Sequence, residues 1–127
     1  MIPIDMNPVR ILIAEDDALI AMSLEELLEA MGYEVCAVVC DQAQVVAAAA
    51  EHRPDLMIVD DGLREGSGIA AVIEILKIKF IPYIFSTGND HRVLSYNPDA
   101  IVLQKPYSVH ALSRAIERAL EPIAPPN

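Results

Sequence analysis

The chain has 127 residues, 54% of them hydrophobic, and its 19 acidic and 9 basic residues give a net charge of -10. The length suits a single domain, because a chain of this size buries roughly two-thirds of its unfolded surface. The longest apolar runs are far shorter than the ~20 residues that span a bilayer, and the negative charge repels nucleic-acid phosphates, so we expect neither membrane insertion nor direct nucleic-acid binding.

The first half of the chain alternates short apolar runs with helical patterns. Apolar and β-branched runs predict strands at residues 10–14, 35–39 and 56–60. Leucines at helical spacing predict a helix over residues 18–31, and Gly32 suits a left-handed helix end. Asp41 can cap a second helix that runs to about His52, because Pro54 forbids continuation.

The second half continues the alternation. Three glycines precede a predicted helix at about 69–79: Gly62, Gly66 and Gly68. Strands are predicted at 82–86 and 100–104. The segment 88–98 between them is short and polar, so we expect one or two helical turns with little apolar surface to hold them. Ser108 can cap a last helix, which Pro122 ends. The residues expected to face inward from it are Val109, Leu112, Ala115, Ile116 and Ala119.

Five alternating strand and helix segments predict an α/β fold with a parallel sheet covered on both faces, because right-handed crossovers place helices there. The natural closure is a doubly wound (βα)5 three-layer sandwich of the flavodoxin-like kind. The pattern itself leaves the strand order open. We predict the order 2-1-3-4-5, which sets the first and third strands side by side and brings together Glu15, Asp16 and Asp60.

Chemically useful side chains follow four of the predicted strands. Glu15 and Asp16 follow the first strand, Asp60 ends the third, Thr87 follows the fourth and Lys105 follows the fifth. The carboxyl ends of neighbouring parallel strands open on one crevice, where such sheets bind ligands. The sequence therefore predicts one site that gathers carboxylates, a hydroxyl and an ammonium group.

Four short motifs give this chain a family resemblance. They are Glu15-Asp16-Asp17, Val59-Asp60-Asp61-Gly62-Leu63 with Gly68 following, Ser86-Thr87-Gly88, and Lys105-Pro106-Tyr107. Each alone is common, but together, in this order and spacing, they resemble the receiver domain of two-component response regulators. The resemblance covers residues 9–120, which we expect to form one receiver domain with short tails at 1–8 and 121–127.

The resemblance implies a function in signalling. A sensor histidine kinase or a histidine phosphotransferase would transfer a phosphoryl group to an aspartate of this chain, with Mg²⁺ required. The chain would act as a single-domain response regulator that signals through a downstream protein effector. We expect no enzymatic activity beyond Mg²⁺-dependent self-phosphorylation and autodephosphorylation. Residues 1–8 lack the pattern of a secretory signal, so we expect a cytoplasmic protein.

The residue types suit the roles that the resemblance implies. A carboxylate can form a covalent acyl phosphate, and Asp60 is placed to be that nucleophile. Lys105 can stabilise the charge on phosphoryl oxygens, and the Thr87 hydroxyl can turn inward to bond one of them. The expected Mg²⁺ ligands are Asp16, Asp60, the backbone carbonyl of Gly62, and Glu15 through a coordinated water.

Other polar residues have simpler interpretations. Asp17 can cap the first helix, and Asp61 suits a turn or a solvated position. Cys36 and Cys40 are too few for a disulfide framework and have no histidine at metal-ligand spacing, so we expect two buried, reduced thiols. The three histidines lack metal-ligand spacing and are expected at the surface: His52, His91 and His110.

The chain departs from the common receiver pattern at three places. Arg64 stands where many receivers have proline, which predicts a more mobile loop after Asp60. Val102 stands where many carry a Tyr or Phe that rotates as a switch, and the segment between Thr87 and Lys105 is short. Phe85-Ser86-Thr87-Gly88 resembles the Phe-Ala-Thr-Gly step of receivers in alphaproteobacterial general stress signalling.

Two other functions stay open. A pseudo-receiver that binds its partner without phosphorylation is favoured if Val102 and the short fourth helix uncouple the site from the surface. A phosphatase of the haloacid dehalogenase type also forms an aspartyl phosphate, but it needs a second Asp two residues after the nucleophile. Gly62 stands there instead.

Overall fold

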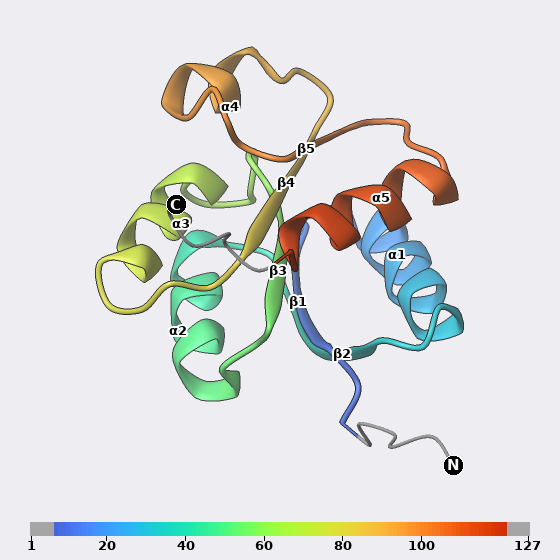
Figure 1. Cartoon of the computed structure of the whole chain (residues 1–127). Helices are drawn as coiled ribbons and strands as arrows, with labels where there is room; N and C mark the ends of the chain where they lie inside the picture. Colours follow the sequence, from blue (N-terminus) through green and yellow to red (C-terminus); the bar gives the residue numbers. More distant parts are fainter. Residues whose placement is uncertain (1–6, 122–127) are drawn as a thin grey trace, which may run out of the picture.

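A computed structural model describes residues 7–121, in which strands and helices alternate along the chain (Figure 1). The strands are β1 (Arg10–Ala14), β2 (Glu34–Val39), β3 (Leu56–Asp60), β4 (Tyr83–Thr87) and β5 (Val102–Gln104). The helices are α1 (Ala18–Ala30), α2 (Gln42–His52), α3 (Gly68–Leu76), α4 (His91–Tyr96) and α5 (Val109–Ala119). Within the described residues, no helix is both long and apolar enough to cross a membrane.

The five strands form one parallel sheet of order β2-β1-β3-β4-β5, which confirms the predicted fold and strand order. In the register of β3 with β4, Asp60 is the partner of Ser86. The pairing of β1 with β2 shifts after Ile11, so that Cys36 is an extra residue on the edge strand. The sheet order places the ends of β1 and β3 next to each other.

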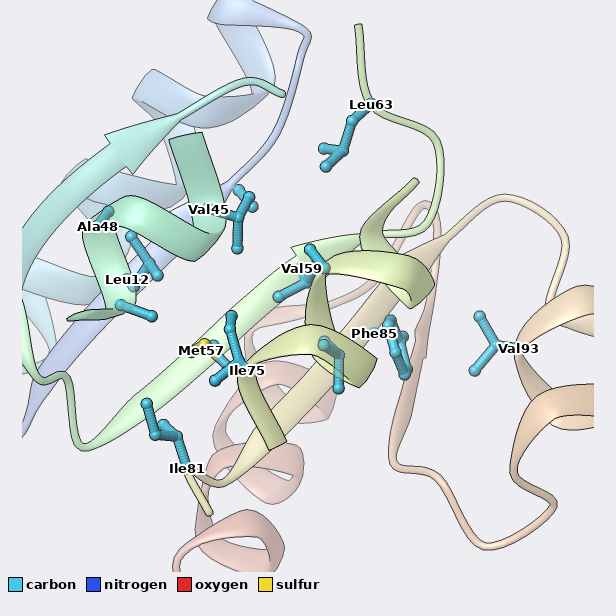
Figure 2. Packing of buried hydrophobic residues seen from close by; sticks show 14 residues of the cluster. Leu12, Val45, Ala48, Met57, Val59, Leu63, Ile75, Ile81, Phe85 and Val93 are labelled. Carbon is cyan, nitrogen blue, oxygen red and sulfur yellow. The ribbon is translucent and has the colours of Figure 1, made fainter. Parts of the chain in front are cut away.

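Helices cover both faces of the sheet, with α1 and α5 on one side and α2, α3 and the short α4 on the other (Figure 1). Each face has its own apolar cluster, because successive side chains of a strand point to opposite faces. Figure 2 shows the cluster on the α2 and α3 side, where Met57, Val59 and Phe85 pack beneath the helices. On the other face, Ile58 and Ile84 pack with Leu28 and Leu112.

Side-chain caps start four of the helices where the sequence provides an Asp or Ser. The capping residues are Asp17, Asp41, Ser67 and Ser108. Each carboxylate or hydroxyl oxygen accepts a hydrogen bond from a backbone N–H of the first turn, which would otherwise lack a partner. Gly32 has φ 95° just after α1, as the left-handed helix end requires. The predicted caps at Asp41 and Ser108 are confirmed.

Two element boundaries differ from the prediction for local reasons. α3 ends at Leu76 and not near 79, because the chain closes a turn there in which the backbone N–H groups of Ile78 and Lys79 both donate to Ile75 O. β5 begins at Val102 and not at Ala100, because the side chain of Asn97 holds a turn by accepting a hydrogen bond from the Asp99 backbone N–H at 3.0 Å. The predicted end at Pro122 lies outside the described residues.

Individual side chains also depart from the expectations. Val109 was expected to face inward but is 54% exposed, because it is the first residue of α5 and lies short of the sheet. The α4 segment is as short as predicted, yet it has an apolar anchor that the prediction lacked. Val93 is fully buried, and the ring of Tyr96 packs edge-on against Phe85 with ring centres 6.4 Å apart.

The buried face of α1 should dominate its contribution to stability. We expect Leu28→Ala to lower the free energy of unfolding by about 2–5 kcal/mol, because Leu28 is fully buried. Leu19→Ala on the same helix should change it by less than about 0.5 kcal/mol, since Leu19 is 75% exposed. Urea denaturation followed by circular dichroism measures both, and equal losses would contradict the packing described for α1.

Candidate functional site

The carboxylates predicted to converge do lie together at the carboxyl ends of β1 and β3. Glu15 and Asp60 are buried, with 5% and 8% of their surface exposed, whereas Asp16 is exposed. One carboxylate oxygen from each of the three residues lies within 4.8 Å of the others. Grouping of this kind raises electrostatic repulsion unless a cation is close by.

Lys105 supplies a cation to this cluster from the loop after β5. Its Nζ donates a hydrogen bond of 2.7 Å to Glu15 Oε1 and another of 2.7 Å to Asp60 Oδ2. Burial alone would lower the pKa of Lys105, but the hydrogen bonds and charges of Asp60 and Glu15 outweigh burial, so its pKa lies above the ordinary value. The ammonium group therefore stays charged.

At Glu15, the opposing effects on the pKa of the carboxyl group have a different outcome. Burial raises the pKa of Glu15 above its usual value, although the hydrogen bond from Lys105 and another from the Asp17 backbone N–H act in the opposite direction. The sequence assigned Glu15 to a coordinated water and did not foresee its ion pair with Lys105. The two residues are 90 positions apart in the chain, so only the assembled sheet shows this pairing.

The three carboxylates suit a hard divalent cation. Mg²⁺ takes oxygen ligands and usually needs only one or two carboxylates, with waters completing its shell. Glu15, Asp16 and Asp60 offer oxygens close enough to share one ion. Gly62 lies beside them, since its backbone N–H donates to Asp60 Oδ1 at 3.0 Å. The donor set therefore fits the predicted metal.

A glycine fixes how closely α3 approaches the end of β3. A Cβ atom on Gly68 would lie 2.0 Å from the backbone oxygen of Asp60 and 2.7 Å from a methyl carbon of Val59. Both distances are far below normal contact, so a side chain here would push α3 away from the strand. Gly68 thereby lets α3 begin directly against the backbone of Asp60.

The loop between β3 and α3 is tied to the start of α2. The Arg64 guanidinium pairs with Asp41 at 3.3 Å, and the Arg64 backbone N–H donates to Cys40 O. Gln42 adds two bonds, because its backbone N–H donates to Glu65 O and its side-chain Oε1 accepts from Ser67 N. The predicted greater mobility of this loop stays a prediction, and these contacts oppose it.

Thr87 lies at the end of β4 with only 2% of its surface exposed. Its hydroxyl donates to Asn89 O at 2.9 Å and accepts from Asn89 N at 3.0 Å. In this conformation the hydroxyl binds the loop that leads to α4. Any inward turn of Thr87 would break both bonds to Asn89.

Two residues with hydroxyl groups were recognised in the sequence only as parts of motifs and were assigned no role. Ser86 is 3% exposed and lies opposite Asp60 in the sheet, and its hydroxyl has no hydrogen-bond partner among the residues described. Tyr107 stands two residues after Lys105, and burial raises the pKa of its phenol. The register with Asp60 is the signal that points to Ser86.

The simpler interpretations can also be compared with the structure. Asp17 caps α1 by accepting from Leu19 N and Ile20 N, as predicted. The backbone oxygen of Asp61 accepts from Gly68 N, in a turn. His91 and His110 are exposed, and His52 is half-buried. Both cysteines are free, as expected, but they are only half-buried.

Val102 lies on the sheet face that α4 covers. It pairs with Phe85 in the register of β4 with β5 and packs, partly buried, against the same apolar cluster. The aromatic contacts on this side come from β4 and α4. The rings of Tyr83 and Tyr96 each contact the ring of Phe85 in an edge-on arrangement. Aromatic side chains are thus present next to Val102, although none stands at its position.

Comparison with known proteins gives a consistent family match. The model of the response regulator receiver domain matches residues 11–117. The transcriptional regulatory protein PdtaR of Mycobacterium tuberculosis is 38% identical over 117 residues, which are 89% of this chain and 57% of PdtaR. The phyllosphere-induced regulator PhyR of Methylorubrum extorquens is 40% identical over 115 residues, 87% of this chain and 43% of PhyR. The chain thus spans about half the length of these two relatives.

Solved structures give the same result. The receiver domain of the Erythrobacter litoralis PhyR response regulator superposes with a TM-score of 0.83 at 31% sequence identity. The superposition covers 94% of this chain and 98% of that domain. The strand order and the full set of helices are therefore those of a known fold.

Removal of the carboxylate of Asp16 and removal of that of Asp17 should change the stability of the protein in opposite directions. In chelator, Asp16→Ala should raise the free energy of unfolding by roughly 0.5 kcal/mol, because it relieves repulsion within the carboxylate cluster. Asp17→Ala should lower it by about 1 kcal/mol, since α1 loses its cap. Chemical denaturation of both variants checks this, and a loss for Asp16→Ala as large as that for Asp17→Ala would refute it.

Proposed function

This chain belongs to the response regulator receiver domain family, and from this membership we propose that it accepts a phosphoryl group on Asp60 from a histidine kinase or a histidine phosphotransferase. The observation that carries the proposal is the contact of Lys105 Nζ with Asp60 Oδ2 at 2.7 Å, beside two further carboxylates. A nucleophile, a fixed cation and oxygen ligands for a metal are thus combined in one crevice.

The transfer would leave an acyl phosphate on the chain. An oxygen of the Asp60 carboxylate attacks phosphorus while the bond between phosphorus and the donor's histidine nitrogen breaks. Lys105 is already hydrogen-bonded to the nucleophile, so its charge is available to phosphoryl oxygens without a large movement. Mg²⁺, when held by Asp16, Asp60, the Gly62 carbonyl and a water on Glu15, would offset the negative charge of the carboxylates and the phosphoryl group.

Thr87 would carry the state of Asp60 to the surface. Its hydroxyl would leave Asn89 and bond a phosphoryl oxygen, so that the loop before α4 loses two hydrogen bonds. α4 is only six residues long, and its Asp90 cap makes no side-chain hydrogen bond. Its first backbone N–H, from His91, bonds the Asn89 side chain, so the residue that Thr87 holds also starts the helix. A short helix held in this way can change its arrangement when Thr87 releases Asn89. A downstream protein effector would read that change.

The alternative is a pseudo-receiver, and Val102 is the observation that favours it. A valine has no ring to rotate, so the common aromatic route from the site to the surface is missing. In that case the chain would bind its partner whether or not Asp60 is modified. Phosphorylation and its structural response therefore need separate tests.

The phosphoacceptor role is tested with a small donor. We expect acetyl phosphate with Mg²⁺ to add one phosphoryl group, seen by intact mass spectrometry, and chelator to prevent the addition. Asp60→Asn should abolish labelling, because it removes the nucleophile. Asp61→Asn serves as the matched control and should keep it, since Asp61 uses its backbone oxygen in a turn. Asp16→Asn should need at least about tenfold more Mg²⁺.

Labelling that persists in Asp60→Asn would refute the assignment of the acceptor. If wild type is never labelled while the family fold is intact, the pseudo-receiver becomes the better description. A partner that co-purifies with wild type but not with Asp60→Ala would identify the effector of the modified state.

The coupling role of Thr87 is tested by hydrogen exchange. Beryllofluoride with Mg²⁺ imitates the phosphoryl group on Asp60, and we expect it to change exchange mainly over residues 88–98 and around Lys105. Thr87→Ala should lose much of this change while Asp60 stays phosphorylatable, because the hydroxyl is the link to Asn89. Thr87→Ser keeps the hydroxyl and should keep the response. A full response in Thr87→Ala would show that the signal takes another route.

A further inference from the structure

An apolar furrow lies between α2 and α3, on the opposite sheet face from α1 and α5. A hollow of about 450 Å³ forms one part of it, and a second hollow of about 530 Å³ adjoins the first at Val46. The apolar lining of the first hollow is Val46, Ala49, Ala50, Ile75, Ile78 and Ile81. Figure 2 shows Ile75 and Ile81 together at one end of the core cluster, beneath this surface.

The furrow has a basic end. Arg53 and Lys79 line the first hollow, and no acidic side chain does so. Neither cation forms an ion pair with any residue from 7 to 121. The chain has a net charge of -10, yet the charged side chains that line this hollow are both cations. They favour a ligand that carries negative charge at this point.

The furrow also has an acidic end. The second hollow is lined by Asp41, Glu65 and Glu74. Asp41 is already paired with Arg64, and Glu74 accepts only a long hydrogen bond of 3.4 Å from Gln42. Glu65 is exposed. Because Val46 belongs to both hollows, the charge changes sign along one continuous surface.

Large apolar side chains extend this surface beyond the hollow. Ile78 is 83% exposed and Phe80 is 63% exposed, in the connection between α3 and β4. Isolated exposed apolar residues are ordinary, but Ile78 lines the apolar hollow, and Phe80 stands in the chain between the lining residues Lys79 and Ile81. Polar contacts alone would not explain such a surface, and the ligand must bring apolar groups of its own.

The directions of the helices select one arrangement of a helical ligand. α2 and α3 both end at the basic end of the furrow, where Arg53 and Lys79 follow them. A ligand helix whose amino end lies there runs antiparallel to both, which is favourable for the helix dipoles. Acidic residues in its first turn and basic residues in its last turn stabilise the same helix by itself.

We propose that this furrow binds an amphipathic helix of a partner protein, with acidic residues at its amino end against Arg53 and Lys79 and basic residues at its carboxyl end against Glu65 and Glu74. Apolar residues at helical spacing would fill the hollow, as in other recognition of a helix by a groove. The basic end lies at the amino ends of β3 and β4, whereas Asp60 lies at the carboxyl end of β3. The acidic end lies in the loop that follows Asp60, on the same side as the phosphoacceptor site.

The test uses a synthetic peptide of about 14 residues, roughly four helical turns. Leucine occupies one helical face, glutamate the first turn and lysine the last. Titration into ¹⁵N-labelled full-length chain should shift the amide signals of α2, α3 and residues 77–81 in a saturable way. A peptide of the same composition, with its leucines at non-helical spacing, should bind with at least tenfold lower affinity in the same titration. Equal shifts from both peptides would indicate non-specific hydrophobic association and would overturn the proposal.

Two variants separate the furrow from other apolar surface. Ile78→Glu should weaken binding at least tenfold, and it should fold because Ile78 is 83% exposed. Val109→Glu is the matched control, since Val109 is an exposed apolar residue on α5, and it should bind like wild type. A spin label on the amino end of the peptide should broaden the amide signals near Lys79 and not those near Glu65.

Three further outcomes would overturn the proposal. They are the absence of saturable shifts, an unchanged affinity in Ile78→Glu, and broadening near Glu65 in place of Lys79. Sedimentation of the chain alone provides the remaining check. If the chain self-associates and Ile78→Glu prevents this, a second copy covers the furrow and no partner helix is needed.

Discussion

The arrangement of the whole site depends on one ammonium group placed between two buried carboxylates. Lys105 contacts Glu15 and Asp60 at 2.7 Å each, and these three residues come from the ends of β5, β1 and β3. Without a cation, two buried carboxylates with Asp16 beside them would repel one another and oppose the pairing of β1 with β3. The ammonium group of Lys105 therefore balances the charge of the site and, by doing so, allows β1 and β3 to lie side by side.

Much of the fold could be predicted because its signals are local. Apolar runs of strand length, leucines at helical spacing and the caps at Asp41 and Ser108 are each visible within a few residues. The inaccurate boundaries lie where contacts outside the element decide, as at the Asn97 turn before β5. Val109 shows what helical spacing cannot predict. The spacing identifies the face of the helix that turns inward, but it does not show how much of that face the sheet covers.

The convergence of these side chains was predictable, but their contacts were not. Parallel strands bring their carboxyl ends together, so the sequence could place Glu15, Asp60 and Lys105 in one crevice. Which carboxylate receives the ammonium group, and that Thr87 bonds Asn89, depends on side-chain directions that no spacing reveals. Ser86 was recognised only as part of a motif, because the sequence does not show its register with Asp60.

The shape of the two outer strands has a consequence for the behaviour of the protein in concentrated solution. Exposed sheet edges are templates for edge-to-edge association, since their backbone N–H and C=O groups lack partners on one side. β5, at one edge, has three residues. β2, at the other, is interrupted by the extra residue Cys36, and such a bulge twists and bends a strand. Both edges are therefore poor templates for a further strand, which opposes association of two copies edge to edge.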